Sequence, residues 1–576
     1  MSANATVLST DVLIIGGGMA YTFAKAGGSA GMWTAKTARQ HVKDVLIVDK
    51  GPLDWGGLCS MSDGNFIVPH EGENLMDWLD DIVYYYDGLC DQKETLDTLA
   101  KSRERFRDYE AMGHTFARNP DGSYHTAPQR GLPHIKATTS APLGKGGQNM
   151  RRELLTALKE LNVRRMGNVM ITKIIKDGDT VSGAAGFFTR SGLPLIIRAR
   201  TVVLATGIGG WKTSYHQNSI SSGCVELALS AGAKLRSMEF AGIWNTPERF
   251  AWTGQSVLLP LGARFLNANG EDFMLNHYSP IIGSKTDTLY NVRAMVLETR
   301  AGRGPITFDV SRIPPEGIAS RRPEAGWMKL NDAKLKAKGV DFFTDTQVWI
   351  PQLQTSQGGV QTDSKGATCV PGLYAVGTAQ SHLVGVYFGG FSLCQAATSG
   401  YDTGLAAGEY AASRDMPAFD FAFAEDCLAR ELDHLGRPGI MPKDMDVTVL
   451  EVVTASDVSI LKSAGALNRA LDAIMHIRSE LVPSMAAPDP HYLGKLIEAR
   501  GMATLTEAFI RSSLTRTESR AGHFREDFPN RDESTPPYWV VLSMENGKMK
   551  THREYLPMEE YPIKPNRFYM DQFNWS

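Results

Sequence analysis

The chain has 576 residues, of which 43% are hydrophobic and 21% charged, and its formal net charge is −3. This length exceeds what one hydrophobic core serves, so we expect about two to four domains. The near-neutral charge gives no sign of nucleic-acid or membrane-surface binding, and no apolar run approaches the length of a membrane span. Residues 1–10 hold neither a basic segment nor a twin arginine, so a cytoplasmic location is expected.

Two apolar runs near the N-terminus predict a strand–helix–strand unit that binds a dinucleotide. Val12–Ile15 breaks into Gly16-Gly17-Gly18, and Val45–Val48 closes on Asp49. In such units the glycines allow a tight turn, the helix N-terminus faces the pyrophosphate and the carboxylate accepts hydrogen bonds from ribose hydroxyls.

The spacing within this unit departs from the usual G-x-G-x-x-G pattern. Tyr21 stands where the third glycine is expected, and a second glycine cluster ends at Gly31. The acidic residue normally follows the glycines by about 20 residues, which fits Gly31 and Asp49 but not Tyr21 and Asp49. We therefore predict a loop insertion around residues 20–28 and a helix that begins near Gly31.

Two later segments repeat the design of a buried strand that ends at a glycine. A helix is predicted over 77–107 and another over 150–161, and the alternating residues 169–200 predict an antiparallel hairpin layer. The strand Thr201–Leu204 then ends in Ala205-Thr206-Gly207, and residues 372–378 end likewise at Gly377. Three such strand ends predict one large cofactor that is contacted at several points.

The rest of the chain changes character twice. Residues 240–355 separate the second and third strand ends, so we expect an inserted domain that closes over the cofactor. Helices are predicted from residue 416 onward, and a Pro- and aromatic-rich tail follows over 528–576. The six cysteines are scattered singly without a C-x-x-C pair, so no metal centre of the chain's own is expected.

These strand ends, together with three further motifs, resemble the flavoprotein subunits of the fumarate reductase/succinate dehydrogenase superfamily. The motifs are Gly146-Gly147-Gln148, Gly302-Arg303-Gly304-Pro305 and the charged run Arg516–Asp527. The resemblance implies an α/β fold: a Rossmann-like FAD-binding domain, an inserted α+β capping domain and a C-terminal helical domain. We expect the FAD-binding domain in residues 1–239 and 356–415, the capping domain in 240–355, and the helical domain with an extended tail in 416–576.

The resemblance also implies which residues contact FAD. Gly16, Gly18 and Asp49 would hold the ADP half, and Val169 would present its backbone to the adenine. The remaining cofactor residues would lie near the nucleotide, the pyrophosphate or the flavin ring: Lys50, Gly57, Ser60, Thr206, Gly207, Gly377, Thr378, Ser392 and Leu393. Since no histidine lies in residues 54–67, where flavinylated members carry their covalent link, we expect noncovalent FAD.

Departures from the family pattern bear on the substrate. Family members that act on fumarate or succinate bind the dicarboxylate with histidine and arginine, because a guanidinium forks onto a carboxylate. Here Trp244-Asn245 replaces the histidine element, Thr288 stands at the capping arginine, and Tyr387 or Phe388 stands at the later arginine. The site should therefore bind fumarate poorly, and the replacements look more like the alpha chain of adenylylsulfate reductase.

Five residues are candidates for contacting substrate or moving a proton. Tyr387 could donate a phenolic proton, and His382 and His216 could act as acid or base. Trp244 and Asn245 lie where the family contacts its substrate. The structural alternatives are packing beside Phe388 and Phe391 for Tyr387, capping-domain core for Trp244 and a surface loop for His216.

These features predict an FAD-dependent oxidoreductase that transfers a hydride between a small substrate and the flavin. The substrate would be adenylylsulfate or sulfite, or an aromatic or hydroxylated organic compound. Electrons would be exchanged with a separate ferredoxin-like iron–sulfur subunit, and an oligomer is allowed. Two alternatives stay open: a self-contained flavin dehydrogenase or oxidase that uses quinone, oxygen or nicotinamide, and a non-catalytic electron-relay subunit.

Overall fold

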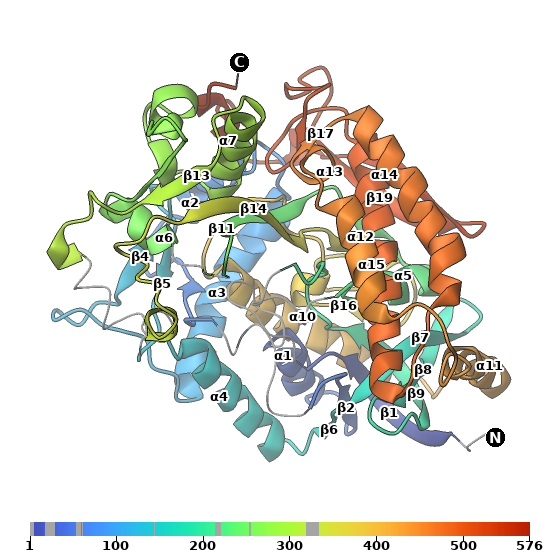
Figure 1. Cartoon of the computed structure of the whole chain (residues 1–576). Helices are drawn as coiled ribbons and strands as arrows, with labels where there is room; N and C mark the ends of the chain where they lie inside the picture. The colour runs from blue at the N-terminus through green and yellow to red at the C-terminus, as the bar shows by residue number, and fades with distance from the viewer. Residues whose placement is uncertain are drawn as a thin grey trace.

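The structure is a computed structural model that describes residues 5–17, 29–52, 59, 62–142, 144–213, 221–250, 252, 255–317, 333–386 and 388–575. A largely parallel sheet lies at its centre, built from β6 (Arg164–Met166), β2 (Val45–Val48), β1 (Thr6–Ile15) and β9 (Pro194–Leu204). The strand β16 (Leu373–Ala375) pairs in parallel with β9, and the antiparallel strands β8 (Thr180–Phe188) and β7 (Val169–Asp177) extend the sheet beyond it (Figure 1).

The register of the sheet brings the three predicted strand ends to one edge. Ile15 pairs with Leu204, and Leu204 pairs with Ala375 on its other side. The four-residue run of β2 is buried on both faces, as expected for a parallel strand covered by helices. In such sheets ligands bind beyond the carboxyl ends of the strands.

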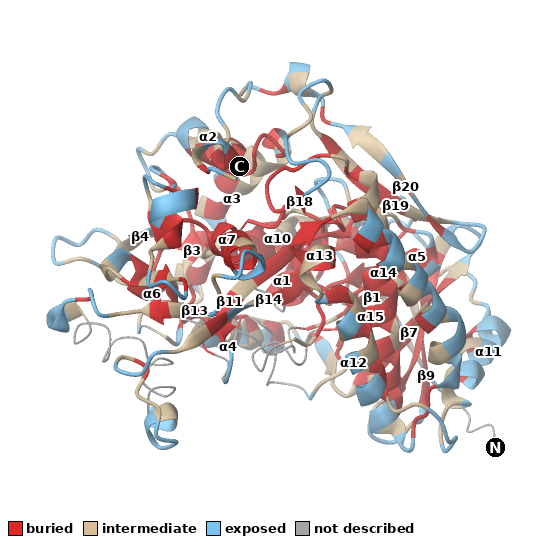
Figure 2. Cartoon of the chain, turned by 45° about the horizontal axis from the view of Figure 1, so that its top comes forward, coloured by how far each residue is buried: buried red, intermediate tan, exposed pale blue. Residues whose placement is uncertain are grey.

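Two helices pack tightly against this sheet, α1 (Ser29–Ala38) and α10 (Phe391–Ala412), and both are buried at the centre of the molecule (Figure 2). Glycines allow their close approach. A Cβ on Gly400 would lie 2.6 Å from the Cβ of Trp33, and one on Gly404 would lie 1.9 Å from Thr37 Oγ1. The helix α1 begins at Ser29, close to the predicted start, and the expected insertion at residues 20–28 lies outside the described residues.

The helix predicted over 77–107 is two helices in the structure, α2 (Leu75–Tyr85) and α3 (Gln92–Ala111). The chain turns between them at Asp87, which has a positive φ of 49°. The buried Asp87 carboxylate accepts hydrogen bonds from the backbone N–H groups of Met570 and Ala521, both from the far end of the chain. These long-range partners explain why the sequence pattern alone did not reveal the break. The helix α4 (Gly146–Glu160) begins one turn before its predicted start.

The inserted segment folds around a second, antiparallel sheet in the order β11 (Ala241–Pro247), β14 (Val348–Ser356), β13 (Ile306–Asp309) and β12 (Arg264–Leu266). The helix α7 (Thr288–Arg300) packs against β11 and β14. Short helical turns complete this capping segment: α6 (Gln255–Leu258), η3 (Leu259–Leu261), η4 (Met274–Tyr278) and η5 (Gly283–Lys285). Inside it, the buried Glu298 accepts hydrogen bonds from Arg303, Asn267 and Tyr278.

Helices dominate the chain after residue 416, as predicted. In Figure 1, α12 (Pro442–Val453), α14 (Ala464–His476) and α15 (Pro490–Thr515) run side by side, and α11 (Phe421–Leu432) packs on β7 and β8. The remaining elements are short: α5 (Val225–Ala231), α13 (Ser456–Ser459), η6 (Gly377–Ala379), η7 (Ile477–Leu481), η8 (Val482–Ser484), η9 (Met558–Glu560), η10 (Tyr569–Gln572), β3 (Phe66–Ile67), β4 (Thr126–Pro128), β5 (Lys136–Thr138), β17 (Leu461–Lys462) and β18 (Phe524–Arg525).

The tail that was expected to be extended contains a β-hairpin. Its strands β19 (Tyr538–Glu545) and β20 (Lys548–Tyr555) join β10 (Leu235–Arg236) and β15 (Gly359–Val360) in one sheet. Asn546 and Gly547 form the turn with positive φ angles, which is the typical two-residue hairpin loop. The sequence therefore carried this signal, and the interpretation of the tail as wholly extended missed it.

A buried ionic cluster joins this hairpin to the helices and the FAD-binding part. The Arg516 side chain donates to Glu239 Oε1 at 2.8 Å, to Glu518 Oε1 at 2.7 Å and to the Tyr538 carbonyl at 2.7 Å. All three charged side chains are at most 1% exposed. Buried carboxylates of this kind are tolerated only while their partner is present.

We expect Arg516→Met to lower the free energy of unfolding by about 3–5 kcal/mol, because Glu239 would be left buried and unpaired and Glu518 would keep only Arg520 as its ion-pair partner. The midpoint of urea unfolding measures the loss. Arg430→Met is the matched control, because Arg430 pairs with Asp426 on the exposed face of α11 and such pairs contribute about 0–1 kcal/mol. Equal losses in the two variants would contradict the prediction.

The neighbouring Lys462 gives stability a pH dependence of defined sign. Its buried amine donates to the Glu239 carbonyl at 2.8 Å and faces His523 Nδ1 at 2.9 Å, and burial lowers the pKa of Lys462 to about 7. An unfolded lysine titrates at about 10.4. Between these pH values the unfolded chain binds a proton that the folded chain has lost, so this amine makes stability rise with pH.

Lys462→Met should remove this contribution. The difference in unfolding free energy between the wild type and the variant should therefore grow in favour of the wild type from about pH 7 to about pH 10. Urea unfolding of both proteins at the two pH values measures it. A difference that stays constant with pH would show that Lys462 is protonated in the folded state throughout.

Candidate functional site

Glycines pack the strand ends and the first turn of α1 against one another. Gly16 has a φ of 104°, and a Cβ there would lie 2.4 Å from the Ala205 carbonyl oxygen. A Cβ on Gly31 would lie 2.4 Å from the Gly16 oxygen, and one on Gly377 would lie 2.6 Å from the Cβ of Ala30. The structure thus brings Gly16, Gly377 and the start of α1 together, and a helix N-terminus at this position favours a phosphate group.

Asp49 lies at the same sheet edge with its carboxylate held by backbone. Its Oδ2 accepts from Gly17 N at 2.9 Å and its Oδ1 accepts from Gly51 N at 2.9 Å. The Val169 N–H donates to the Asp49 carbonyl at 2.8 Å, so these two predicted residues are neighbours. This fixed carboxylate is positioned to accept from ribose hydroxyls.

Lys50, the next residue, points to the helical part of the chain. Its Nζ donates to Glu498 Oε1 on α15 at 2.6 Å and to Ser221 Oγ at 3.3 Å. Glu498 also pairs with Lys212 and Lys495, and these positive charges hold the pKa of Glu498 well below its usual range. A cofactor role for Lys50 stays a prediction, whereas the structure shows its ion pair with Glu498 of α15.

A second group of predicted cofactor residues gathers at the start of α10. Gly390 precedes this helix with a φ of 92°, and a Cβ there would lie 2.9 Å from the Asn65 carbonyl oxygen. A Cβ on Gly147 of α4 would lie 1.8 Å from the Cys59 carbonyl oxygen. The first turns of two helices therefore pack closely against Cys59 and Asn65, near the residues 56–61 that we expect beside the flavin ring.

Buried polar atoms without partners mark the same place. Ser392 Oγ and Asn65 Oδ1 have no hydrogen-bond partner among the described residues. Buried polar groups are almost always satisfied, so these two atoms are open to a partner such as a bound group. A cofactor with polar ring atoms fits them, and the N-terminus of α10 favours negative charge on that ring. Leu393, Thr206, Gly207 and Thr378 lie at the adjoining helix and strand ends.

The structure separates Trp244 from Asn245, because neighbouring residues of a strand point to opposite faces. Asn245 Oδ1 accepts from Gln255 Nε2 at 2.9 Å, and its amide faces Met295 of α7 inside the capping segment. Trp244 lies on the other face, and its buried Nε1 has no partner among the described residues. This indole N–H therefore has no acceptor among the described residues, while Asn245 packs within the cap.

Gln352 was not predicted from the sequence. It pairs with Trp244 across β11 and β14, so the two side chains share a face. Its Nε2 donates to the Thr213 carbonyl at 3.1 Å, in the segment after the second strand end. This contact places Trp244 next to the FAD-binding part, and only the strand register could reveal it.

His382 faces away from this region. Its Nδ1 lies 3.2 Å from Glu94 Oε1 and its Nε2 lies 2.9 Å from Gln380 Oε1. Burial and the charge of Arg236 lower the pKa of His382 to about 3, so the imidazole is neutral near pH 7. Burial raises the pKa of Glu94 to about 7.

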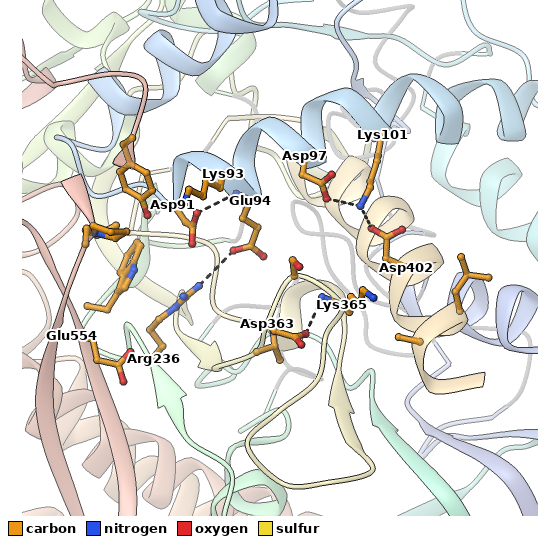
Figure 3. A pocket seen from close by; sticks show the side chains of 18 of the residues that line it. Asp91, Lys93, Glu94, Asp97, Lys101, Arg236, Asp363, Lys365, Asp402 and Glu554 are labelled. Carbon is orange, nitrogen blue, oxygen red and sulfur yellow. Dashed lines mark hydrogen bonds and ion pairs between the residues drawn. The ribbon is translucent and has the colours of Figure 1, made fainter. Parts of the chain in front are cut away.

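These groups line a small hollow of about 30 Å³, which is enough for a single water molecule. A cavity of about 750 Å³ adjoins it between α3, α10 and the hairpin (Figure 3). The figure shows Lys101 of α3 between Asp97 and Asp402, and Arg236 pointing toward Glu94. Since Lys101 and Arg236 are paired with carboxylates of this cavity, we assign it no catalytic role.

Three arginines of the capping segment are bound to carboxylates. Arg303 forks onto Glu298 with two contacts of 2.7 Å, Arg264 binds Asp309 at 2.8 Å, and Arg300 binds Glu526 at 2.7 Å. Thr288 stands first on α7, and its buried Oγ1 has no partner among the described residues. The first position of α7, which we call the substrate wall together with Trp244 of β11, thus carries a hydroxyl where the family pattern led us to expect a guanidinium.

Five predicted site residues lie outside the described residues: Gly18, Gly57, Ser60, His216 and Tyr387. All six cysteines are free thiols. Among the described residues, no group of three His, Cys, Asp or Glu side chains could hold a metal ion. Within the same ranges, no helix has the length and apolar character needed to cross a membrane.

Residues 11–392 match the family model described as an FAD binding domain, and residues 448–569 match that of the fumarate reductase flavoprotein C-terminus. A fumarate reductase (CoM/CoB) chain of Methanothermobacter marburgensis is 27% identical over 94% of this chain and 97% of its own length. An L-aspartate oxidase of Streptomyces coelicolor is 25% identical over 93% and 92%.

Two solved structures share the fold. Quinol fumarate reductase of E. coli superimposes with a TM-score of 0.83 at 21% identity, over 97% of this chain and 98% of that one. Adenylylsulfate reductase of Archaeoglobus fulgidus does so with a TM-score of 0.78 at 18% identity, over 96% and 97%. The predicted α/β fold with FAD-binding, capping and helical parts and the predicted cofactor, FAD, are confirmed.

We expect Asp49→Ala to lose most of its bound FAD, because the ribose acceptor and the link between the Gly17 and Gly51 N–H groups disappear together. The ratio of flavin to protein absorbance after purification measures the loss. Asp44→Ala is the control, since Asp44 forms an exposed pair with Arg164. Full flavin content in Asp49→Ala, with unchanged FAD affinity, would remove Asp49 from the cofactor site.

Proposed function

Since this chain belongs to the fumarate reductase/succinate dehydrogenase flavoprotein superfamily and is an FAD-dependent oxidoreductase, we propose that its substrate is a small molecule other than a C4 dicarboxylate. The observation that supports this proposal is that three capping arginines are already bound to carboxylates. Arg303, Arg264 and Arg300 are committed to Glu298, Asp309 and Glu526, and the first position of α7 is Thr288. A neutral hydroxylated or aromatic compound suits a wall formed by Thr288 and Trp244. The adenylylsulfate/sulfite pair is anionic, and it stays a candidate because of the replacements in the family pattern at Trp244-Asn245 and Tyr387.

Bound FAD supplies two-electron redox chemistry. The chain would orient the substrate with the Trp244 indole N–H and the Thr288 hydroxyl, both buried and both without other partners among the described residues. The capping segment would exclude water from this space. The N-terminus of α10 would stabilise negative charge that develops beside Ser392.

Proton transfer is proposed for Tyr387 or His216. His382 is poorly suited, because its pKa of about 3 leaves it neutral and its two ring nitrogens face Glu94 and Gln380. At neutral pH it would neither donate a proton readily nor turn toward the substrate without breaking both contacts.

For electron exchange we propose a separate iron–sulfur protein. The free cysteines of the chain and the subunit status of its fumarate reductase relatives support this route. Its similarity to L-aspartate oxidases favours a second candidate, a self-contained oxidase that reduces oxygen. Rapid reoxidation of the dithionite-reduced protein in air would favour the oxidase, and slow reoxidation would favour the protein partner.

We expect fumarate to leave the reduced flavin unoxidised under anaerobic conditions, because Thr288 stands where the family pattern has an arginine and the capping arginines Arg303, Arg264 and Arg300 are bound to carboxylates. Stopped-flow absorbance at the flavin band measures this. Adenylylsulfate, sulfite and polyphenols are tested in the same way for reoxidation, reduction or a shift of the band. Fumarate-dependent reoxidation far faster than in buffer alone would overturn the proposed substrate class.

A further inference from the structure

The tail over residues 556–575 links the FAD-binding part to the capping segment. After the hairpin it runs along α3, where the Gln92 amide exchanges two hydrogen bonds with the Ile563 backbone at 2.8 and 3.0 Å. It then reaches the turn after α2, where Met570 N donates to Asp87 Oδ1 at 3.0 Å. Figure 1 shows the end of the chain beside α7.

The first capping contact of the tail lies at the start of α7. Asp287 caps this helix by accepting from Leu289 N at 2.8 Å. Tyr569 of the tail bonds to Thr286 Oγ1 at 2.9 Å and accepts from Asp287 N at 3.3 Å. Tyr85 of α2 donates to Asp287 Oδ2 at 2.6 Å. The residues just before Thr288 are therefore held from the tail and from the FAD-binding part at once.

A second contact is an aromatic stack along α7. The ring of Phe573 lies 4.3 Å from that of Tyr290 at an interplanar angle of 5°, and Trp575 continues the stack at 5.3 Å from Phe573. Asn574 N donates to the Tyr278 carbonyl at 2.9 Å. The tail therefore follows the helix over two successive turns.

The third contact involves a buried cation. Arg293 of α7 is 6% exposed, and its guanidinium lies 4.4 Å from the Phe524 ring and 4.1 Å from the Trp575 ring. Its Nε and Nη1 have no hydrogen-bond partner among the described residues. Burial lowers the pKa of Arg293 to about 10. A cation placed in this way depends on the aromatic faces that cover it.

We propose that the tail is a strap that fixes helix α7 of the capping segment against the FAD-binding part, with Tyr569 and Trp575 as positioning residues for the substrate wall at Thr288. The tail is anchored at Gln92 and Asp87 in the FAD-binding part, and it holds α7 at Asp287, Tyr290 and Arg293. The effect of the strap on catalysis rests on the proposed function, because Thr288 lies on the wall that the strap positions. The mechanical role of the strap, which is to hold α7 in place, does not depend on the proposed function.

Hydrogen exchange of the FAD-loaded protein tests the strap directly. In Trp575→Ala the amides of residues 286–300 should exchange about tenfold faster or more, because local opening of α7 becomes easier. Peptides of β1, α1 and α15 and the flavin content should stay unchanged. Trp575→Phe should restore most of the protection, since it retains an aromatic face. Wild-type exchange at α7 in Trp575→Ala would overturn the proposal.

The control variant is Tyr555→Ala, which removes a half-exposed aromatic ring from β20 without touching α7. It should leave α7 exchange at the wild-type rate. Equal acceleration in both variants would mean that any aromatic loss in this region loosens the protein, which would also overturn the strap.

Once a substrate has been identified, Trp575→Ala and Tyr569→Phe should raise KM several-fold with a smaller change in kcat. The reason is that the substrate wall is displaced while the flavin site stays intact. An unchanged KM together with accelerated α7 exchange would overturn the positioning role and leave the strap. If no substrate is turned over even by the wild type, the proposed function fails, and hydrogen exchange still decides on the strap.

Discussion

The molecule depends on the register of three parallel strands whose carboxyl ends meet at Ile15, Leu204 and Ala375. These strands, β1, β9 and β16, come from distant parts of the chain. Because β1 and β16 both pair in parallel with β9, the glycines that follow the three strands come together. Gly16 and Gly31 then permit contacts that any side chain would block. The packing of α1 and α10 follows from this edge, and ligands of such sheets bind beyond it.

Much of this edge was visible in the sequence, because short apolar runs that end in glycine have few alternatives to a buried parallel strand. Asp49 and Val169 could be assigned from spacing and resemblance, and they are neighbours in the structure. The turn at Asp87 could not be predicted, since its partners Met570 and Ala521 lie far away along the chain. The hairpin after Tyr538 could have been, because Asn546-Gly547 is a strong turn signal.

The directions of side chains were harder to predict from the sequence than the positions of strands. His382 follows the third strand end closely in sequence, yet its ring turns to Glu94 of α3, and only the packing of α3 against α10 decides this. Trp244 and Asn245 are adjacent in sequence and point to opposite faces. Gln352 became visible only through its cross-strand pairing. In each case a long-range partner, which no local pattern encodes, sets the direction.

Asp49 and Lys50 are joined by one peptide bond but serve different parts of the molecule. The carboxylate of Asp49 faces the nucleotide edge, and the amine of Lys50 is bound to Glu498 on α15. A ligand that rigidifies the turn at Asp49 therefore also rigidifies the anchor of the helical part. By thermodynamic linkage, part of the binding free energy of a ligand held at Asp49 would then stabilise the docking of α15 through Lys50 and Glu498.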